Sequence, residues 1–146
     1  MIILIVDLKA GWKEKIHMLK TVTPVNVLVA DDDAMMLKLI DLTLSKSGYN
    51  ITTVLNGMDA LREIGKHHYD VVITDIMMPG MEGIELISEI IDRKSNAKIL
   101  AISSDQAAGF TSLLTLAKTV GASEILSKPF RPAQLVEVMD RLATRH

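Results

Sequence analysis

Four short apolar runs of the sequence each end in polar side chains of the same few types. These polar residues are Asp31 and Asp32 after the first run, Asp75 at the second, Ser103 after the third and Lys128 after the fourth. An ionised carboxylate is a nucleophile that can form a covalent intermediate. Further carboxylates can hold a hard cation, and a hydroxyl and an ammonium can bind phosphoryl oxygens. Together these residue types indicate a phosphorylatable carboxylate.

For that chemistry the carboxyl ends of the four runs must lie close together in the fold, so that their polar residues share one site. The runs are residues 25–30, 71–73, 99–102 and 125–126. Each is typical of a short buried strand followed by a break, as found in parallel sheets. In such sheets functional groups gather beyond the carboxyl ends of the strands, so residues roughly 100 positions apart in sequence can share one crevice.

From Val25 onward, strand and helix patterns alternate five times. The predicted strands are 25–30, 50–55, 70–75, 97–103 and 122–127, and the predicted helices are 34–47, 57–67, 83–93, 106–119 and 132–144. Two helical stripes should pack on the sheet, Met36, Leu39, Ile40, Leu44 and Leu135, Val138, Met139, Leu142. Breakers separate elements at Gly48, Pro79-Gly80, Gly121 and Pro132. This repeat predicts an α/β fold with a doubly wound parallel sheet and helices on both faces.

Length and composition restrict the class of protein. A chain of 146 residues is expected to form one domain with a sizeable core. The net charge of −2 argues against a nucleic-acid binder, which needs a basic surface to neutralise phosphates. There are no cysteines, which excludes disulfides and thiolate metal sites and fits a cytoplasmic location. The opening run, residues 2–6, is followed by Asp7, so neither a signal peptide nor a membrane span is predicted.

Residues 1–24 stand outside the repeat. Trp12, Ile16 and Leu19 have helical spacing, with lysines around them. The segment is interpreted as an N-terminal extension, either a frayed leader or a docking arm. Pro24 marks the boundary with the domain predicted for residues 25–146, because the residue before a proline is pushed out of helical geometry.

The motifs that follow the strands carry a family resemblance. They are VLVADDD at 27–33, VVITDIMMPGMEG at 71–83, ILAISS at 99–104 and ILSKPF at 125–130. In this order and spacing they resemble the receiver domain of two-component response regulators, of the single-domain chemotaxis or phosphorelay type. The resemblance implies a flavodoxin-like five-stranded sheet with strand order 2-1-3-4-5, whose crevice lies between the first and third strands.

The resemblance also implies a role for each polar residue. Asp75 matches the phosphoacceptor. Asp31 and Asp32 match an acidic pair that, together with Asp75 and the backbone carbonyl of Met77, binds Mg²⁺, with Mn²⁺ as a possible substitute. Lys128 matches an ammonium that pairs with Asp75 and then with the phosphoryl group, and Ser103 matches a switch hydroxyl. The bond between Lys128 and Pro129 is expected to be a cis peptide.

The implied function is that of a stand-alone signalling domain rather than an enzyme. Its phosphodonor would be a histidine kinase or a histidine phosphotransfer protein. Its downstream protein target would bind the face made by the predicted helix 106–119, strand 122–127 and helix 132–144. Ile125 stands where the family often has an aromatic residue, so the switch is expected to repack an aliphatic side chain. No nucleic-acid or membrane partner is implied.

Two other functions fit part of the pattern. Asp31 and Asp33 also form the strand-terminal Asp-x-Asp of a phosphohydrolase similar to the haloacid dehalogenases. That interpretation lacks an acidic pair after Lys128, and Asp33 is more typical of a helix cap. The other alternative is an interaction module that keeps the fold without phosphorylation. His67 and His68 are interpreted as residues of a solvated helix end.

Overall fold

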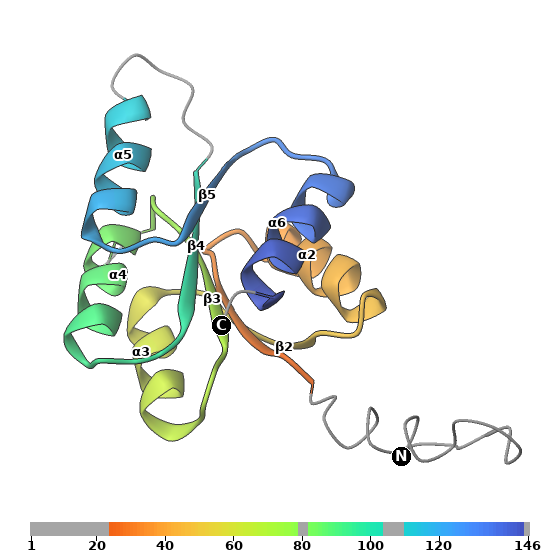
Figure 1. Ribbon diagram of the computed structural model, residues 1–146, viewed down its shortest axis with the longest axis horizontal. Helices are drawn as coiled ribbons and strands as arrows, with labels where there is room; N and C mark the ends of the chain where they lie inside the picture. Colours follow the sequence, from red (N-terminus) through yellow and green to blue (C-terminus); the bar gives the residue numbers. More distant parts are fainter. Residues whose placement is uncertain (1–23, 79–81, 104–109, 145–146) are drawn as a thin grey trace, which may run out of the picture.

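The computed structural model describes residues 24–78, 82–103 and 110–144 (Figure 1). Three sequence-based predictions therefore fall outside the described residues. They are the structure of the N-terminal extension, the Pro79-Gly80 turn and the first turn predicted for helix 106–119.

Five strands form one parallel sheet, as predicted. They are β1 (Asn26–Ala30), β2 (Asn50–Val54), β3 (Val71–Asp75), β4 (Lys98–Ser103) and β5 (Glu124–Ser127). Their order across the sheet is β2-β1-β3-β4-β5, and each neighbouring pair is parallel. This is the flavodoxin-like order, which leaves the crevice at the carboxyl ends of β1 and β3.

Five described helices cover both faces of the sheet. They are α2 (Ala34–Lys46), α3 (Gly57–Lys66), α4 (Gly83–Asp92), α5 (Phe110–Val120) and α6 (Pro132–Thr144). In Figure 1, α3, α4 and α5 lie on one side of the strands, and α2 and α6 lie on the other. None of the described helices has the length and apolar character needed to cross a bilayer.

The two cores follow from the alternation of side chains along each strand. In β1, Leu28 and Ala30 point into the core under α3, α4 and α5, whereas Val27 and Val29 point into the core under α2 and α6. All four residues are fully buried. A central strand of a two-sided sheet has no polar face, which explains why the sequence shows continuous apolar runs rather than alternation.

Helix ends fall where local chemistry favours them. Asp33 caps α2, because its Oδ1 accepts hydrogen bonds from the backbone N–H groups of Met35 and Met36 at 3.0 and 3.3 Å. After α2, Gly48 adopts a φ of 93°, a conformation that favours glycine. β5 begins at Glu124, two residues later than predicted. The N–H of Ala122 still donates to the carbonyl of Ala117 at 2.8 Å, so residue 122 belongs to the closing turn of α5.

One of the two predicted stripes was partly wrong. In α6 the side chains of Leu135, Val138, Met139 and Leu142 are all buried, as predicted. In α2 the buried residues are Leu37, Ile40 and Leu44, while Leu39 is 39% exposed. Leu37 and Leu39 lie on opposite edges of the stripe formed by Met36, Ile40 and Leu44, and the docking of α2 against the sheet and α6 buries the Leu37 edge.

The turn after α2 is linked to α6 by a hydrogen bond with a pH dependence. Tyr49 Oη donates to Asp140 Oδ1 at 2.9 Å. Burial, then the hydrogen bond to Asp140 and its negative charge, raise the pKa of Tyr49 to about 12. Tyr49→Phe is expected to cost about 1 kcal/mol of unfolding free energy at neutral pH.

This stabilisation should be fully present below pH 10, the ordinary pKa of tyrosine, and should be lost as the pH rises towards 12. Urea unfolding of the wild type and Tyr49→Phe between pH 8 and pH 12 measures the difference. A difference that stays constant with pH would contradict the assigned contact.

Candidate functional site

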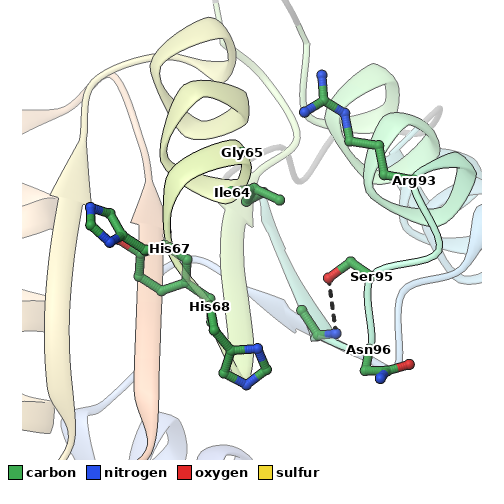
Figure 2. A pocket seen from close by; sticks show the side chains of 9 residues that line it. Ile64, Gly65, His67, His68, Arg93, Ser95 and Asn96 are labelled. Atoms are coloured by element: carbon green, nitrogen blue, oxygen red, sulfur yellow. Dashed lines mark hydrogen bonds between the residues drawn. The ribbon is translucent and has the colours of Figure 1, made fainter.

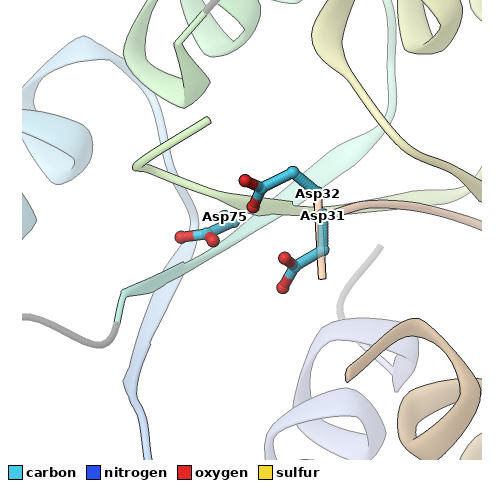
Figure 3. A group of neighbouring side chains, drawn as sticks. All are labelled: Asp31, Asp32 and Asp75. Atoms are coloured by element: carbon cyan, nitrogen blue, oxygen red, sulfur yellow. The ribbon is translucent and has the colours of Figure 1, made fainter. Parts of the chain in front are cut away.

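Three carboxylates meet at the carboxyl ends of the two central strands. Asp31 and Asp32 directly follow β1, and Asp75 is the last residue of β3. One oxygen of each lies within 4.8 Å of the other two (Figure 3). Asp31 and Asp75 are buried, whereas Asp32 is exposed. Strand order alone creates this cluster, because β1 and β3 are hydrogen-bonded neighbours in the sheet.

Lys128 reaches the cluster from just beyond β5. Its Nζ lies 2.7 Å from Asp31 Oδ2 and 3.3 Å from Asp75 Oδ2, and the side chain is buried. The expected cis peptide between Lys128 and Pro129 is present. The sequence pointed to Asp75 as the partner of Lys128, but the shorter contact is with Asp31. The ammonium thus bridges the two buried carboxylates.

The second carboxylate oxygen of Asp31 and of Asp75, which does not face Lys128, accepts a hydrogen bond from a backbone N–H group. Asp31 Oδ1 accepts from the N–H of Asp33 at 2.9 Å, and Asp75 Oδ1 accepts from the N–H of Met77 at 3.2 Å. Asp32 differs from both, since its carboxylate accepts no hydrogen bond from the described residues. Asp32 is therefore the carboxylate with the fewest protein contacts and the most room for an added ligand.

The charges in the cluster oppose each other. Burial raises the pKa of Asp75, and the negative charge of Asp31 raises it further, while the charge of Lys128 and the Met77 N–H act in the opposite direction. Burial by itself would lower the pKa of Lys128, but the hydrogen bond that its ammonium donates to Asp31 and the charges of both carboxylates outweigh it and raise that pKa. Lys128 is therefore protonated at neutral pH, and of the two buried carboxylates Asp75 has the longer contact with its ammonium, 3.3 Å against 2.7 Å.

Ser103 brings a hydroxyl to the same edge of the sheet. It is the last residue of β4, and its carbonyl accepts a hydrogen bond from the N–H of Lys128 at 2.7 Å. Its Oγ is fully buried and has no hydrogen-bond partner among the described residues. A buried hydroxyl without a partner costs about 1–3 kcal/mol, and this one is free to donate to a group that enters the crevice.

The cluster opens into a hollow of about 490 Å³. It is lined by Asp31, Asp32, Asp33, Met36, Asp75, Met77, Lys128 and Pro129. Carboxylate and carbonyl oxygens are the ligands that Mg²⁺ and Mn²⁺ prefer, and a bound divalent ion would compensate the excess negative charge. Met77 lines the hollow, which is compatible with the expected contribution of its backbone carbonyl. The residues present therefore fit a hard divalent cation.

A second hollow, of about 320 Å³, lies beside the C-terminal end of α3 (Figure 2). Its lining includes His67, His68 and Arg93. Both histidines are exposed, as predicted for a solvated helix end, and His68 Nε2 lies 3.0 Å from Asp70 Oδ1. None of the three clustered carboxylates lines this hollow, so it lies apart from the site at β1 and β3.

The different surroundings of Asp32 and Asp33 lead to a prediction. Asp32→Asn should weaken Mg²⁺ binding roughly tenfold or more, since it removes a ligand charge from the cluster. Asp33→Asn should leave the affinity almost unchanged, because Asp33 caps α2 and asparagine caps as well. Isothermal titration of both variants with Mg²⁺ makes the comparison. Equal losses of affinity would contradict the assignment.

Known proteins resemble this chain in sequence and fold. A family model described as the response regulator receiver domain matches residues 27–140. The chemotaxis protein CheY of Thermotoga maritima is 34% identical over 118 residues, which is 80% of this chain and 96% of that protein. The structure of the chemotaxis response regulator CheY4 of Vibrio cholerae is 30% identical, with a TM-score of 0.74 over 82% of this chain and 99% of that one.

Other relatives are longer. The probable transcriptional regulator ycf29 of Porphyra purpurea is 30% identical over 122 residues, which cover 82% of this chain but 57% of that protein. The chain therefore spans only a little more than half the length of this relative.

Proposed function

Because the chain belongs to the response regulator receiver domain family, we propose that it accepts a phosphoryl group on Asp75 and signals in the modified form. The observation that carries the proposal is the convergence of the Asp31, Asp32 and Asp75 carboxylates with the Lys128 ammonium at one edge of the sheet. A nucleophile, a cation site and a permanent positive charge are thereby held within reach of one phosphoryl group.

In the proposed reaction a carboxylate oxygen of Asp75 attacks the phosphorus of a phosphohistidine. A new O–P bond forms while the P–N bond to the imidazole breaks, and the bonding electron pair stays on the imidazole nitrogen. The carboxylate needs no general base if it is ionised. Asp31, Asp32 and Asp75 would hold a divalent ion, which would cancel negative charge on the carboxylates and on the phosphoryl oxygens.

Two further side chains have distinct proposed roles. Lys128 holds Asp31 and Asp75 together before the reaction and can donate to a phosphoryl oxygen afterwards. Ser103 has an unpartnered hydroxyl and can donate to the phosphoryl group once it is present. Since the carbonyl of Ser103 binds the N–H of Lys128, a movement of either residue is transmitted to β5.

The proposed partners are proteins. The phosphodonor would be a histidine kinase or a phosphotransfer protein, and the exposed Met77 at the hollow offers it an adaptable apolar surface. The downstream target would bind the face of α5, β5 and α6, where Ile125 is 37% exposed. We propose a cytoplasmic signalling domain with no nucleic-acid partner.

The phosphohydrolase alternative is not favoured. It requires Asp33 as an acid or base, but the Asp33 carboxylate is engaged as the cap of α2. A domain that accepts one phosphoryl group and a hydrolase that turns over many are also distinguishable in solution.

The test is incubation of the protein with acetyl phosphate, with and without Mg²⁺, followed by intact mass spectrometry. We expect a gain of one phosphoryl group that requires Mg²⁺, and no sustained hydrolysis of p-nitrophenyl phosphate. Modification of equal extent in EDTA, or continuous release of phosphate from the ester, would contradict the proposed function.

A further inference from the structure

The first residue of α4 lies directly against the backbone of the phosphoacceptor strand. Gly83 is buried, and a methyl group at its Cα would overlap the carbonyl oxygen of Asp75 and lie 2.6 Å from the Cα of Ile76. Both obstacles are backbone atoms, which cannot rotate away as a flexible side chain can. Nonbonded carbon atoms prefer separations of about 3.5–4.0 Å, so no other residue fits here without a shift of the chain.

Backbone conformation does not explain the glycine. Two other glycines, Gly48 and Gly121, have positive φ angles, but Gly83 does not. An alanine at position 83 would therefore be acceptable to the local dihedral angles. Close approach to Asp75 and Ile76 is the reason that a side chain is excluded.

A chain of hydrogen bonds extends this contact to the site. The N–H of Gly83 donates to the carbonyl of Ile76 at 3.0 Å, and the N–H of Ile76 donates to the carbonyl of Ile102 in β4 at 2.8 Å. Residue 76 is thus clamped between α4 and β4. It separates Asp75 from Met77, whose N–H donates to Asp75 Oδ1.

Within the described residues, the N-terminus of α4 is not fixed by a side-chain cap. Its N-cap residue, Glu82, makes no side-chain hydrogen bond to the helix. The Gly83 to Ile76 hydrogen bond therefore helps to fix where α4 begins relative to β3, together with the packing of Leu86 in the core.

The geometry points to Gly83 as a positioning residue that aims the Asp75 carboxylate and the segment through Met77 at the cation site. This inference rests on one part of the proposed function, namely that the carboxylates bind Mg²⁺, and does not require phosphorylation. Without the side chain, α4 can approach close enough to lock residue 76. With a side chain, the Asp75 to Met77 segment must move away and the oxygen cluster loses its spacing.

The test compares three full-length variants by Mg²⁺ titration and urea unfolding. Gly83→Ala should bind Mg²⁺ roughly tenfold more weakly than the wild type, as is typical when residues that orient metal ligands are altered. Gly65→Ala is the matched control, because its added methyl meets only Arg93 Nη1 at 3.9 Å, and it should leave the affinity unchanged.

Leu86→Ala controls for lost stability. Leu86 is fully buried one turn further along α4 and is not among the residues that line the hollow. It should lower the stability while the folded protein keeps its Mg²⁺ affinity. Wild-type affinity in Gly83→Ala, or an equal loss in Leu86→Ala, would overturn the positioning role.

A measurement on the wild type covers the case in which Gly83→Ala does not fold. In a Mg²⁺ titration followed by ¹⁵N NMR, the amide signal of Gly83 should shift with the same half-saturation as that of Met77, and that of Gly65 should not. A Gly83 signal that stays in place while Met77 shifts overturns this inference alone. Absence of any Mg²⁺ binding by the wild type would instead refute the proposed cation site.

Discussion

Replacing Lys128 with methionine is expected to lower the free energy of unfolding of the metal-free protein by about 3–5 kcal/mol. The ammonium bridges the buried carboxylates of Asp31 and Asp75, and its removal leaves two buried negative charges without their nearest counter-charge. Methionine preserves most of the side-chain volume, so the loss should reflect charge rather than a cavity. Urea unfolding in EDTA measures it.

The same variant should respond strongly to Mg²⁺. A divalent ion on the three carboxylates replaces the missing positive charge, so saturating Mg²⁺ should recover a larger part of the stability in Lys128→Met than it adds to the wild type. Lys66→Met, at the exposed end of α3, is the control and should change stability by about 0.5 kcal/mol or less. If both variants behaved alike, the bridging role of Lys128 would be refuted.

Asp75→Asn is expected to have the opposite effect and to stabilise the metal-free protein at neutral pH. Burial and the charge of Asp31 raise the pKa of Asp75, so the ionised carboxylate is less stable in the folded protein than in the unfolded chain. Asparagine removes the charge, and Lys128 keeps its shorter contact with Asp31.

The stability that Asp75→Asn gains over the wild type should increase with pH. A carboxyl group whose pKa is raised by folding destabilises the native state as the pH rises from below its unfolded pKa through its folded pKa. The advantage of Asp75→Asn should therefore be small in acid, where Asp75 is protonated in both states, and should grow as the pH rises through the raised pKa of the folded protein. Urea unfolding from pH 3 to pH 7, with Asp33→Asn as the control, tests this. An advantage that is largest in acid would contradict the electrostatic account.

Much of the fold could be predicted because its signals are local. Short apolar runs separated by breakers identify the strands, and Asp33 and Pro132 define the starts of α2 and α6 through caps and fixed backbone angles. The polar site residues could also be identified, since the carboxyl ends of parallel strands share one edge. No long-range geometry is needed for that inference.

Other features depend on distances that sequence patterns do not contain. The choice of Leu37 over Leu39 depends on how α2 docks against α6 and the sheet. The preference of Lys128 for Asp31 over Asp75 depends on a difference of 0.6 Å between two contacts, 2.7 and 3.3 Å. The role inferred for Gly83 required the position of α4 relative to Asp75.

The central claim is that Asp75 carries the phosphoryl group. Its most direct test is intact mass spectrometry of the wild type, Asp75→Asn and Asp33→Asn after incubation with acetyl phosphate and Mg²⁺. We predict that the wild type and Asp33→Asn each gain one phosphoryl group and that Asp75→Asn, which stays folded, gains none. Modification of Asp75→Asn to the same extent as the wild type would show that the acceptor is another residue.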